Sequence, residues 1–337
     1  MKKYFCSIGL LALFGFATAQ TETITVYTYR HYESDTALYK QFTEQTGIEV
    51  EVVKSKAGAL VERLIAEGPK TPADVLLTVD AGGLYIAKDA EILQPIDSEY
   101  LETRIPENLR DPEGFWFGFT QRARVIAYSP ERVSLEELST YEALAEPTWR
   151  GRIIARSSSN VYNQSLLASI MANSDKKTAI QWASAVRKNM ARPPQGNDRD
   201  QMRAVAAGLA DAALVNTYYL GLLATSDNEK DREVAAKLRF FFPNQDGRGT
   251  HVNVSGAGIV KHADNVEGAK KFLEFLASDE AQKVFPAATS EYPVVSTVEW
   301  SDLQKTWGSF KADKTSLAEV GALNAEAIRA FNFAGWE

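Results

Sequence analysis

The chain has 337 residues, of which 45% are hydrophobic and 24% are charged, and its formal net charge is −7. An acidic protein repels polyanions, so we expect neither nucleic acid nor an anionic membrane as a partner. The single cysteine, Cys6, lies close to the N-terminus, which excludes disulfides, thiolate catalysis and cysteine-ligated metals from the rest of the chain. The length exceeds one ordinary hydrophobic core, so two lobes are expected.

Residues 1–19 have the three parts of a secretory signal peptide. Lys2 and Lys3 form a basic start, a short apolar run follows over 8–16, and small residues form a cleavage site at 17–19. The apolar run is too short for a membrane-spanning helix. We therefore expect this segment to be removed and the mature protein to be exported to the periplasm.

The first part of the mature chain alternates between strand and helix patterns. Strands are expected over 21–29, 48–53 and 74–79, and helices from Ser34 or Asp35, over 59–67 and over 83–88. This order is typical of parallel strands joined by crossover helices. His31 and Tyr32 fall between the first strand and the first helix, at the sheet edge where α/β proteins bind ligands.

The remainder of the chain continues this alternation of strands and helices, and two of its extended segments are expected to cross between the lobes. Further strands are expected at 151–157, 212–215, 238–242 and 252–260, and helical segments at 135–144, 161–170, 179–189, 198–208, 265–285 and, with breaks, 301–333. Two extended runs over 115–129, around 121–124, suggest a crossing between lobes, and 245–260 suggests the return. We therefore expect an N-terminal lobe of residues 20–120 and 247–298, and a C-terminal lobe of residues 121–246 and 299–337.

Tyrosines occupy two more of the strand-to-helix junctions. Asn160 is expected to cap a helix that carries Tyr162 in its first turn, and an Asn-Thr pair precedes Tyr218 and Tyr219 in the same way. Adjacent tyrosines taken alone are more often packed core residues. The other two junctions favour a shared ligand site, because such junctions meet at one edge of a sheet.

Phenol oxygens and an imidazole from these junctions are typical of a metal site rather than a sugar or amino-acid pocket. Phenolate is a hard donor that suits a hard, highly charged cation, of which ferric iron is the abundant example. A free tyrosine titrates near pH ~10, so ionisation at neutral pH needs a strong positive charge such as a bound trivalent metal. Arg122 or Arg124, if either faces the cleft, would offset the negative charge left by Fe³⁺ with four phenolates.

Other patterns are weaker. The Gly256–Gly258 run lies within an expected strand without a following helix, so it does not indicate a dinucleotide loop, and neither HExxH nor GxSxG occurs. His251 and His262 are expected at the surface or in turns rather than as ligands. The serines at 157–159 are expected to cap a helix, although a helix start can also cradle an anion.

Five segments together resemble the periplasmic ferric-iron-binding proteins of ABC importers. They are RHY at 30–32, AEGPKTPADVLLTVDAGGL at 66–84, QRARVIAYS at 121–129, SSSNVYNQSL at 157–166 and NTYYLG at 216–221. The resemblance covers essentially the whole mature chain. It is closest to the branch, including the cyanobacterial Fut-type proteins, that binds iron through protein ligands without a required anion.

The resemblance implies an α/β, two-lobed periplasmic solute-binding protein fold of type II, with a ligand cleft between lobes joined by β-type hinge strands. It also implies a site for Fe³⁺, in which His31 is a ligand or neighbour and Arg122 is a second-sphere charge. The implied tyrosine ligands are Tyr32, Tyr162, Tyr218 and Tyr219. Some members carry an arginine four residues after the second tyrosine, where this chain has Leu223.

The resemblance further implies a binding protein rather than an enzyme, expected as a monomer that delivers its iron to an ABC transporter permease in the inner membrane. Two alternatives stay open. One is a binding protein of the same fold for a polyamine, sulfate or another small solute, and a polyamine site would combine aromatic rings with carboxylates. The other is an exported non-haem iron oxidoreductase, which would need open coordination positions on the metal.

Overall fold

The computed structural model describes residues 22–30, 32 and 34–336. The predicted signal peptide and His31 lie outside the described residues, so both stay predictions. Within the described residues, no helix is both long enough and apolar enough to cross a membrane.

The chain begins with the expected parallel strands and crossover helices. Strand β1 (Thr23–Thr28) lies between β2 (Glu49–Lys54) and β3 (Val75–Thr78), and both pairings are parallel. The connecting helices are α1 (Ser34–Thr46), α2 (Ala57–Glu67) and α3 (Ala81–Asp89), and β4 (Leu93–Gln94) and α4 (Glu99–Arg104) follow. The predicted α/β order of this lobe is thereby confirmed.

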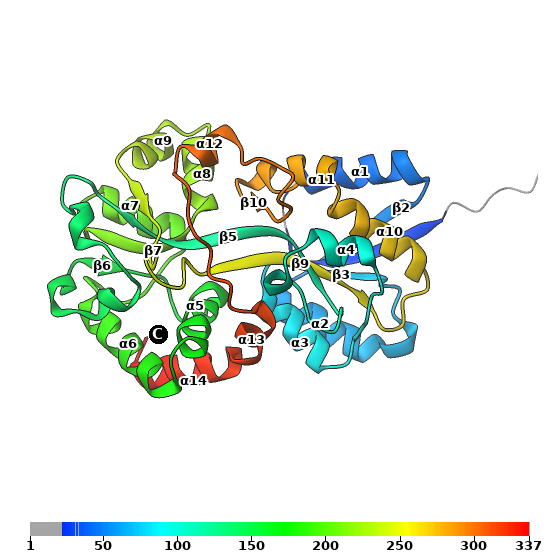
Figure 1. Ribbon diagram of the computed structural model, residues 1–337, viewed down its shortest axis with the longest axis horizontal. Coiled ribbons are helices and arrows are strands. Elements are labelled where there is room, and N and C mark those ends of the chain that lie inside the picture. Colours follow the sequence, from blue (N-terminus) through cyan, green and yellow to red (C-terminus); the bar gives the residue numbers. More distant parts are fainter. Residues whose placement is uncertain (1–21, 31, 33, 337) are drawn as a thin grey trace, which may run out of the picture.

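Two long strands connect this lobe with the second one. Strand β5 (Phe117–Tyr128) pairs antiparallel with β9 (Val252–Val260), and the sheet order is β2-β1-β3-β9-β5-β7-β6. Figure 1 shows both strands running from one lobe into the other. The prediction of two separate runs around 121–124 is wrong, because these residues pair without a break. The pairing of β5 with β9 is interrupted instead between Gly118 and Thr120, where the register shifts.

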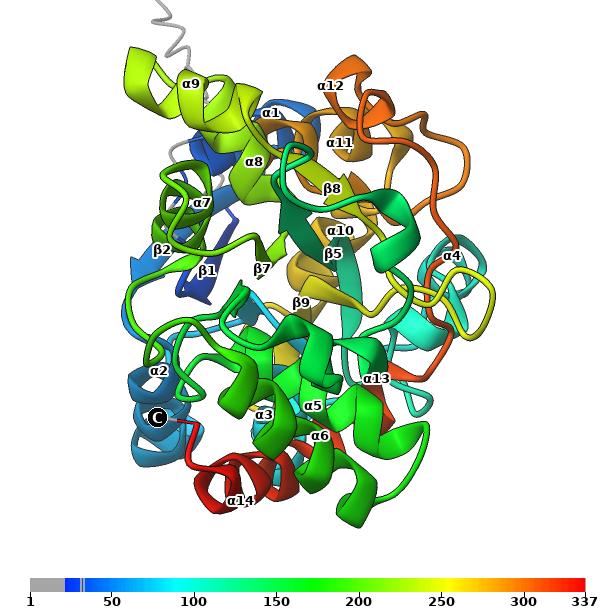
Figure 2. The same ribbon diagram turned by 90° about the vertical axis from the view of Figure 1, so that its left-hand side faces the viewer.

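The second lobe surrounds β6 (Ile153–Ile154), β7 (Ala212–Asn216) and β8 (Arg239–Phe241) with helices. These are α5 (Val161–Ala172), α6 (Lys176–Asn189), α7 (Asp198–Ala206), α8 (Tyr218–Ala224) and α9 (Glu229–Ala236). Figure 2 shows α5 and α6 on one side of the strands and α7, α8 and α9 on the other. The strand expected at 151–157 is only two residues long, and the helical stretch at 135–144 is two short 3-10 turns.

The C-terminal part differs from its prediction at one point. The single helix expected at 265–285 is divided into α10 (Val266–Leu276) and α11 (Asp279–Val284), because the Ser278 hydroxyl caps α11 by accepting a hydrogen bond from the Ala281 amide at 3.2 Å. After β10 (Tyr292–Pro293), the tail forms α12 (Asp302–Lys305), α13 (Leu317–Ala322) and α14 (Asn324–Ala334). Helix α13 packs against α3 and α5, so the tail contacts both lobes. The predicted lobe boundaries stay a prediction.

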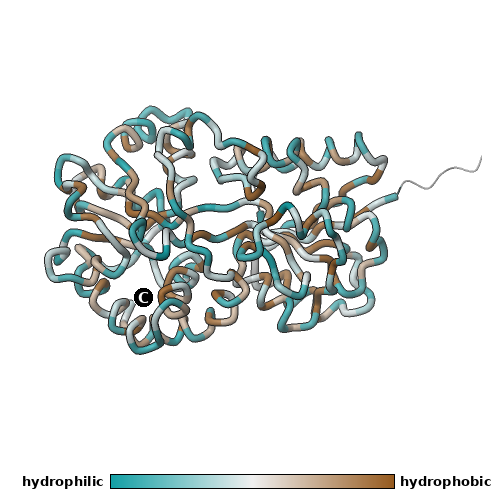
Figure 3. Tube along the Cα trace, in the orientation of Figure 1, coloured by the Kyte–Doolittle hydropathy of each residue, from teal (hydrophilic) through white to brown (hydrophobic). Residues whose placement is uncertain are grey.

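The crossing strands lie in the hydrophobic interior, where Figure 3 shows apolar residues gathered along the sheet. Every residue of β9 is buried, and Gln121 is the one residue of β5 that is not. Two arginines of β5, Arg122 and Arg124, are therefore enclosed by protein. A buried guanidinium requires charged or polar partners, so these arginines determine what must surround them.

Gly258 makes the close approach of β9 to the segment that leads into β5 possible. A methyl group at Gly258 would lie 2.5 Å from the carbonyl oxygen of Phe115. We expect Gly258→Ala to lower the free energy of unfolding by about 1–3 kcal/mol, because the backbone must move to relieve this contact. Gly58→Ala is the control, since a methyl group there meets nothing within 4 Å in a helix, and it should be neutral or stabilising. Urea unfolding measures both, and a Gly258→Ala variant as stable as wild type would contradict the close contact.

Candidate metal centre

The tyrosines lie at the predicted junctions between strands and helices. Tyr162 is the second residue of α5, and Asn160 caps that helix by accepting a hydrogen bond from the Tyr162 amide at 3.1 Å. Tyr218 and Tyr219 begin α8. Thr217 does not cap α8 with its side chain. Its hydroxyl instead accepts from the Ala123 amide at 3.3 Å, which ties the start of α8 to the crossing strand β5.

The structure brings the phenols from these junctions together. The Tyr218 hydroxyl donates a hydrogen bond to the Tyr162 hydroxyl at 3.0 Å, and the rings of Tyr218 and Tyr219 are 4.2 Å apart. Tyr32 is linked to them through two arginines. Arg30 lies 4.9 Å from the centre of the Tyr32 ring and Arg122 lies 5.6 Å from that of Tyr162, and the Ser255 hydroxyl accepts hydrogen bonds from both guanidinium groups. The three junctions therefore contribute to one site, to which His31 cannot be assigned from the described residues.

Three phenols of this site, those of Tyr32, Tyr162 and Tyr218, are harder to ionise than a free tyrosine. Burial is the main cause that raises the pKa of Tyr32, Tyr162 and Tyr218 above the ordinary value. Neighbouring phenols raise these pKa values further, since adjacent phenolates repel each other. A ligand that binds the phenolates must therefore displace their protons.

Arg122 lies beside the phenols and carries unused hydrogen-bond donors. Its guanidinium is 5.6 Å from the centre of the Tyr162 ring, and its charge lowers the pKa of Tyr32, Tyr162 and Tyr218 against the effect of burial. The side chain is buried, yet its Nε and Nη2 atoms have no hydrogen-bond partner among the described residues. The predicted role of Arg122 as a charge that offsets anionic ligands stays a prediction.

Arg124, the other arginine left open by the sequence, has a different role. It forms an ion pair with Asp198 and donates to the amide oxygens of Asn163, at 2.6 Å, and Asn216, at 3.2 Å. Asp198 also pairs with Arg156 at 2.7 Å. Arg124 therefore fixes the start of α7 and α5 against β5.

A buried ionic network beneath the tyrosines was not anticipated from the sequence. Arg30 donates to Asp35 at 3.0 Å and to Glu291 at 3.2 Å, and its guanidinium lies 4.9 Å from the Tyr32 ring. Glu291 also pairs with Arg122 at 3.4 Å. The adjoining cations hold the pKa of Glu291 below its ordinary value despite burial. Arg30 belongs to the quoted RHY segment, whereas no local pattern marked Glu291.

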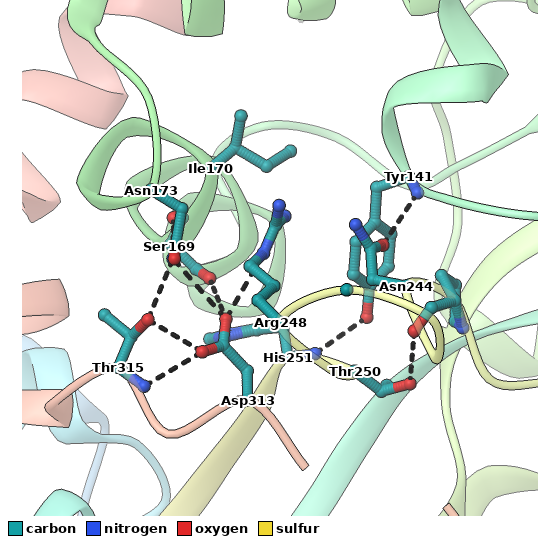
Figure 4. Close-up of polar contacts among 12 residues, drawn as sticks. Tyr141, Ser169, Ile170, Asn173, Asn244, Arg248, Thr250, His251, Asp313 and Thr315 are labelled. Carbon is teal, nitrogen blue, oxygen red and sulfur yellow. Dashed lines mark hydrogen bonds and ion pairs between the residues drawn. The ribbon is translucent and has the colours of Figure 1, made fainter. Parts of the chain in front are cut away.

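His251 is buried, so its prediction as a surface or turn residue is wrong, whereas His262 is exposed. A hydrogen bond of 2.8 Å joins the Nε2 atom of His251 and the Ser165 hydroxyl, and the His251 amide donates to the Tyr141 hydroxyl at 3.1 Å. Figure 4 shows it beside Asp313 and Arg248 rather than in a metal cluster. No group of three His, Cys, Asp or Glu side chains among the described residues could hold a metal.

The fold and this site together define a class of protein. Two α/β lobes joined by crossing strands, with helix-start tyrosines gathered at the crossing, are the architecture of a periplasmic solute-binding protein. The chain belongs to the bacterial extracellular solute-binding protein family, whose profile matches residues 30–283.

Three relatives extend this result. Iron uptake protein A1 of Synechocystis sp. is 50% identical over 318 residues, which are 94% of this chain and 88% of that protein. The solved structure of the Trichodesmium protein IdiA (FutA), in complex with iron and citrate ligands, is 52% identical with a TM-score of 0.91 and covers 94% of this chain and 100% of that one. A ferric binding protein from Campylobacter jejuni is 42% identical with a TM-score of 0.88, covering 93% and 100%. The predicted two-lobed fold is confirmed by these neighbours.

The burial of His251 predicts a pH dependence of stability. Burial lowers its pKa to about 3, below the ~6.5 of an unfolded histidine, so the unfolded chain binds an extra proton between these values. This contribution is fully present above pH ~6.5 and is lost as the pH falls towards 3. We expect the loss of unfolding free energy between pH 7 and 5 to be smaller in His251→Gln by about 2 kcal/mol. Urea unfolding at both pH values measures it, and equal losses in variant and wild type would contradict burial of a neutral imidazole.

Proposed function

We propose that this protein captures ferric iron between its lobes and delivers it to an ABC-type permease. The observation that carries the proposal is the convergence of the Tyr162 and Tyr218 phenols, 3.0 Å apart, beside Arg122, whose guanidinium keeps two nitrogens without a partner among the described residues. The relatives support it: one is named an iron uptake protein, one a ferric binding protein, and one was solved with iron and citrate.

In this proposal Fe³⁺ is the cargo and phenolates are its main ligands. Tyr32, Tyr162, Tyr218 and Tyr219 coordinate the ion, and His31 is either a ligand or a neighbour. Fe³⁺ with four phenolates leaves a charge of −1, which the Arg122 guanidinium offsets from the second sphere. Binding takes place when the trivalent ion displaces the phenol protons.

The proposed role is transport rather than catalysis. An oxidoreductase needs open coordination positions on iron, and a shell of four phenolates and a possible imidazole leaves few. We further propose that the mature protein works as a periplasmic monomer. A polyamine is a poorer ligand for this cleft, because the carboxylates adjoining the tyrosines, Asp35 and Glu291, are already paired with arginines.

The visible absorption of the iron-loaded protein tests whether the tyrosines are ligands. Fe³⁺ added to the apo-protein should give a visible tyrosinate charge-transfer band at one iron per chain. Tyr162→Phe and Tyr219→Phe should weaken this band and lower iron affinity by about a hundredfold or more, since even outer-sphere changes cost about 10–100-fold. Tyr128→Phe, at the far end of β5, is the matched control and should bind as wild type does. Unchanged colour and affinity in the first two variants would show that those phenols are only packed.

Acid should release the iron. A free tyrosine titrates near pH ~10, and burial raises the pKa of Tyr32, Tyr162 and Tyr218 further, so binding of one Fe³⁺ through four phenolates at neutral pH releases up to four protons. Affinity therefore falls as the pH falls, by as much as about four decades per pH unit, before competition from iron hydroxide and buffer anions flattens the slope. A carboxylate site would change little above pH ~5. Iron retention against a chelator between pH 8 and 5, corrected for the chelator's own protonation, measures the slope, and a slope near zero would exclude phenolate ligation.

A further inference from the structure

Glu291 is a buried carboxylate that connects the two arginines of the site. One of its oxygens accepts from Arg30 at 3.2 Å and from the hydroxyls of Thr120, at 2.9 Å, and Thr289, at 3.0 Å. The other accepts from Arg122 at 3.4 Å. Both carboxylate oxygens of Glu291 therefore accept hydrogen bonds, and its side chain is 3% exposed.

Each of these arginines faces a different tyrosine. Arg30 lies 4.9 Å from the ring centre of Tyr32, and Arg122 lies 5.6 Å from that of Tyr162. The Ser255 hydroxyl on β9 accepts from both guanidinium groups, at 2.7 and 3.2 Å. Glu291 therefore joins the supports of two phenols that come from separate junctions of the fold.

The backbone around Glu291 holds its carboxylate in place. The Glu291 amide donates to the Pro286 carbonyl at 2.9 Å, and the preceding Ser290 adopts a left-handed conformation with φ +59°. Ser290 packs on α8 at Gly221, where an added methyl group would lie 2.4 Å from the serine hydroxyl. The turn that carries Glu291 thus abuts the helix that begins with Tyr218 and Tyr219.

The charges of the network cancel in pairs. Arg30 pairs with Asp35, and Glu291 pairs with both arginines, so the four groups sum to zero. Arg122 has no other anionic partner in the described part of the chain. Glu291 therefore removes much of the positive potential that Arg122 would otherwise apply to the phenolates. It is also near enough to Tyr32 to act on that phenol electrostatically.

We propose that Glu291 is a positioning and charge-setting residue of the iron site. It holds Arg30 and Arg122 against the tyrosine rings, and its charge keeps the affinity for ferric iron low enough for release. The inference rests on the proposed function, because it concerns the same phenolates. It assigns the balance between capture and release to a residue whose carboxylate binds arginines and threonines rather than the proposed tyrosine ligands.

The Glu291→Gln substitution removes the negative charge of this side chain but nearly keeps its shape. The amide oxygen can still accept from an arginine, and the amide nitrogen can donate to the threonine hydroxyls. With the negative charge gone, the anionic iron site faces an additional net positive charge. We expect roughly tenfold tighter binding of Fe³⁺ or more, from the Coulomb energy of charges several ångströms apart at an effective dielectric constant of about 20. The same change should make the Fe³⁺/Fe²⁺ potential more positive.

The experiment compares wild type with Glu291→Gln, Glu291→Asp and Asp313→Asn as full-length mature proteins loaded with Fe³⁺. Iron affinity is measured by chelator competition at neutral pH, and the potential and charge-transfer energy by spectroelectrochemistry. Glu291→Asp keeps the charge and should stay near wild type. Asp313 is the matched control, because it is a buried carboxylate paired with Arg248 at 3.3 Å that acts on Tyr141 and His251 (Figure 4).

The outcomes distinguish this inference from the proposed function. Absence of a charge-transfer band in wild type would overturn the proposed function itself. A normal wild type with unchanged or weaker iron binding and an unchanged potential in Glu291→Gln would overturn the role of Glu291 alone. If that variant does not fold, Asp35→Asn removes a charge from the same network and should tighten binding and raise the potential in the same way. Failure of Asp35→Asn to do so would also overturn the inference.

Discussion

Burial of two arginines on the crossing strand is the constraint on which this structure depends. Strand β5 is enclosed along nearly its whole length, yet it carries Arg122 and Arg124. Because an uncompensated buried charge is costly, anionic partners must come from distant elements. Asp198 at the start of α7 meets Arg124, and Glu291, ahead of β10, meets Arg122. Satisfying these charges brings α7 and the turn before β10 against the crossing strands.

The two arginines differ because β5 changes partners between them. Arg122 pairs with Asn253 on β9, whereas Arg124 pairs with Asn216 on β7. Arg124 thus lies within the second lobe, where polar side chains occupy its terminal nitrogens. Arg122 lies at the crossing and keeps two nitrogens without a partner among the described residues. Strand β5 therefore carries Arg124, whose charge has a structural role, and two residues before it Arg122, whose charge is available to a binding site.

Local signals in the sequence predicted where the tyrosines lie, but not what surrounds them. The Asn160 cap and the strand before Tyr218 are short-range features, so the junctions could be recognised from neighbouring residues. The ionic network could not, because Arg30 and Glu291 are separated by 261 positions and meet through tertiary packing. The break at Ser278 was missed for a different reason, since its cap is a local feature but the apolar pattern continues through it. His251 was misplaced because it follows a predicted turn, whereas in the structure it is buried and its ring is hydrogen-bonded to Ser165 of α5.

A site made of neutral phenols selects its ligand by acidity. Carboxylates are already charged at neutral pH, so a carboxylate cleft would attract common divalent cations such as calcium and magnesium. A free tyrosine is already neutral at pH 7, burial raises the pKa of Tyr162 and Tyr218 further, and an arginine beside them repels cations. Only an ion that gains enough from phenolate ligation to expel several protons can displace them, and a hard trivalent metal meets that condition. In the proposed function, burial of these tyrosines therefore favours a hard trivalent ion over common divalent cations.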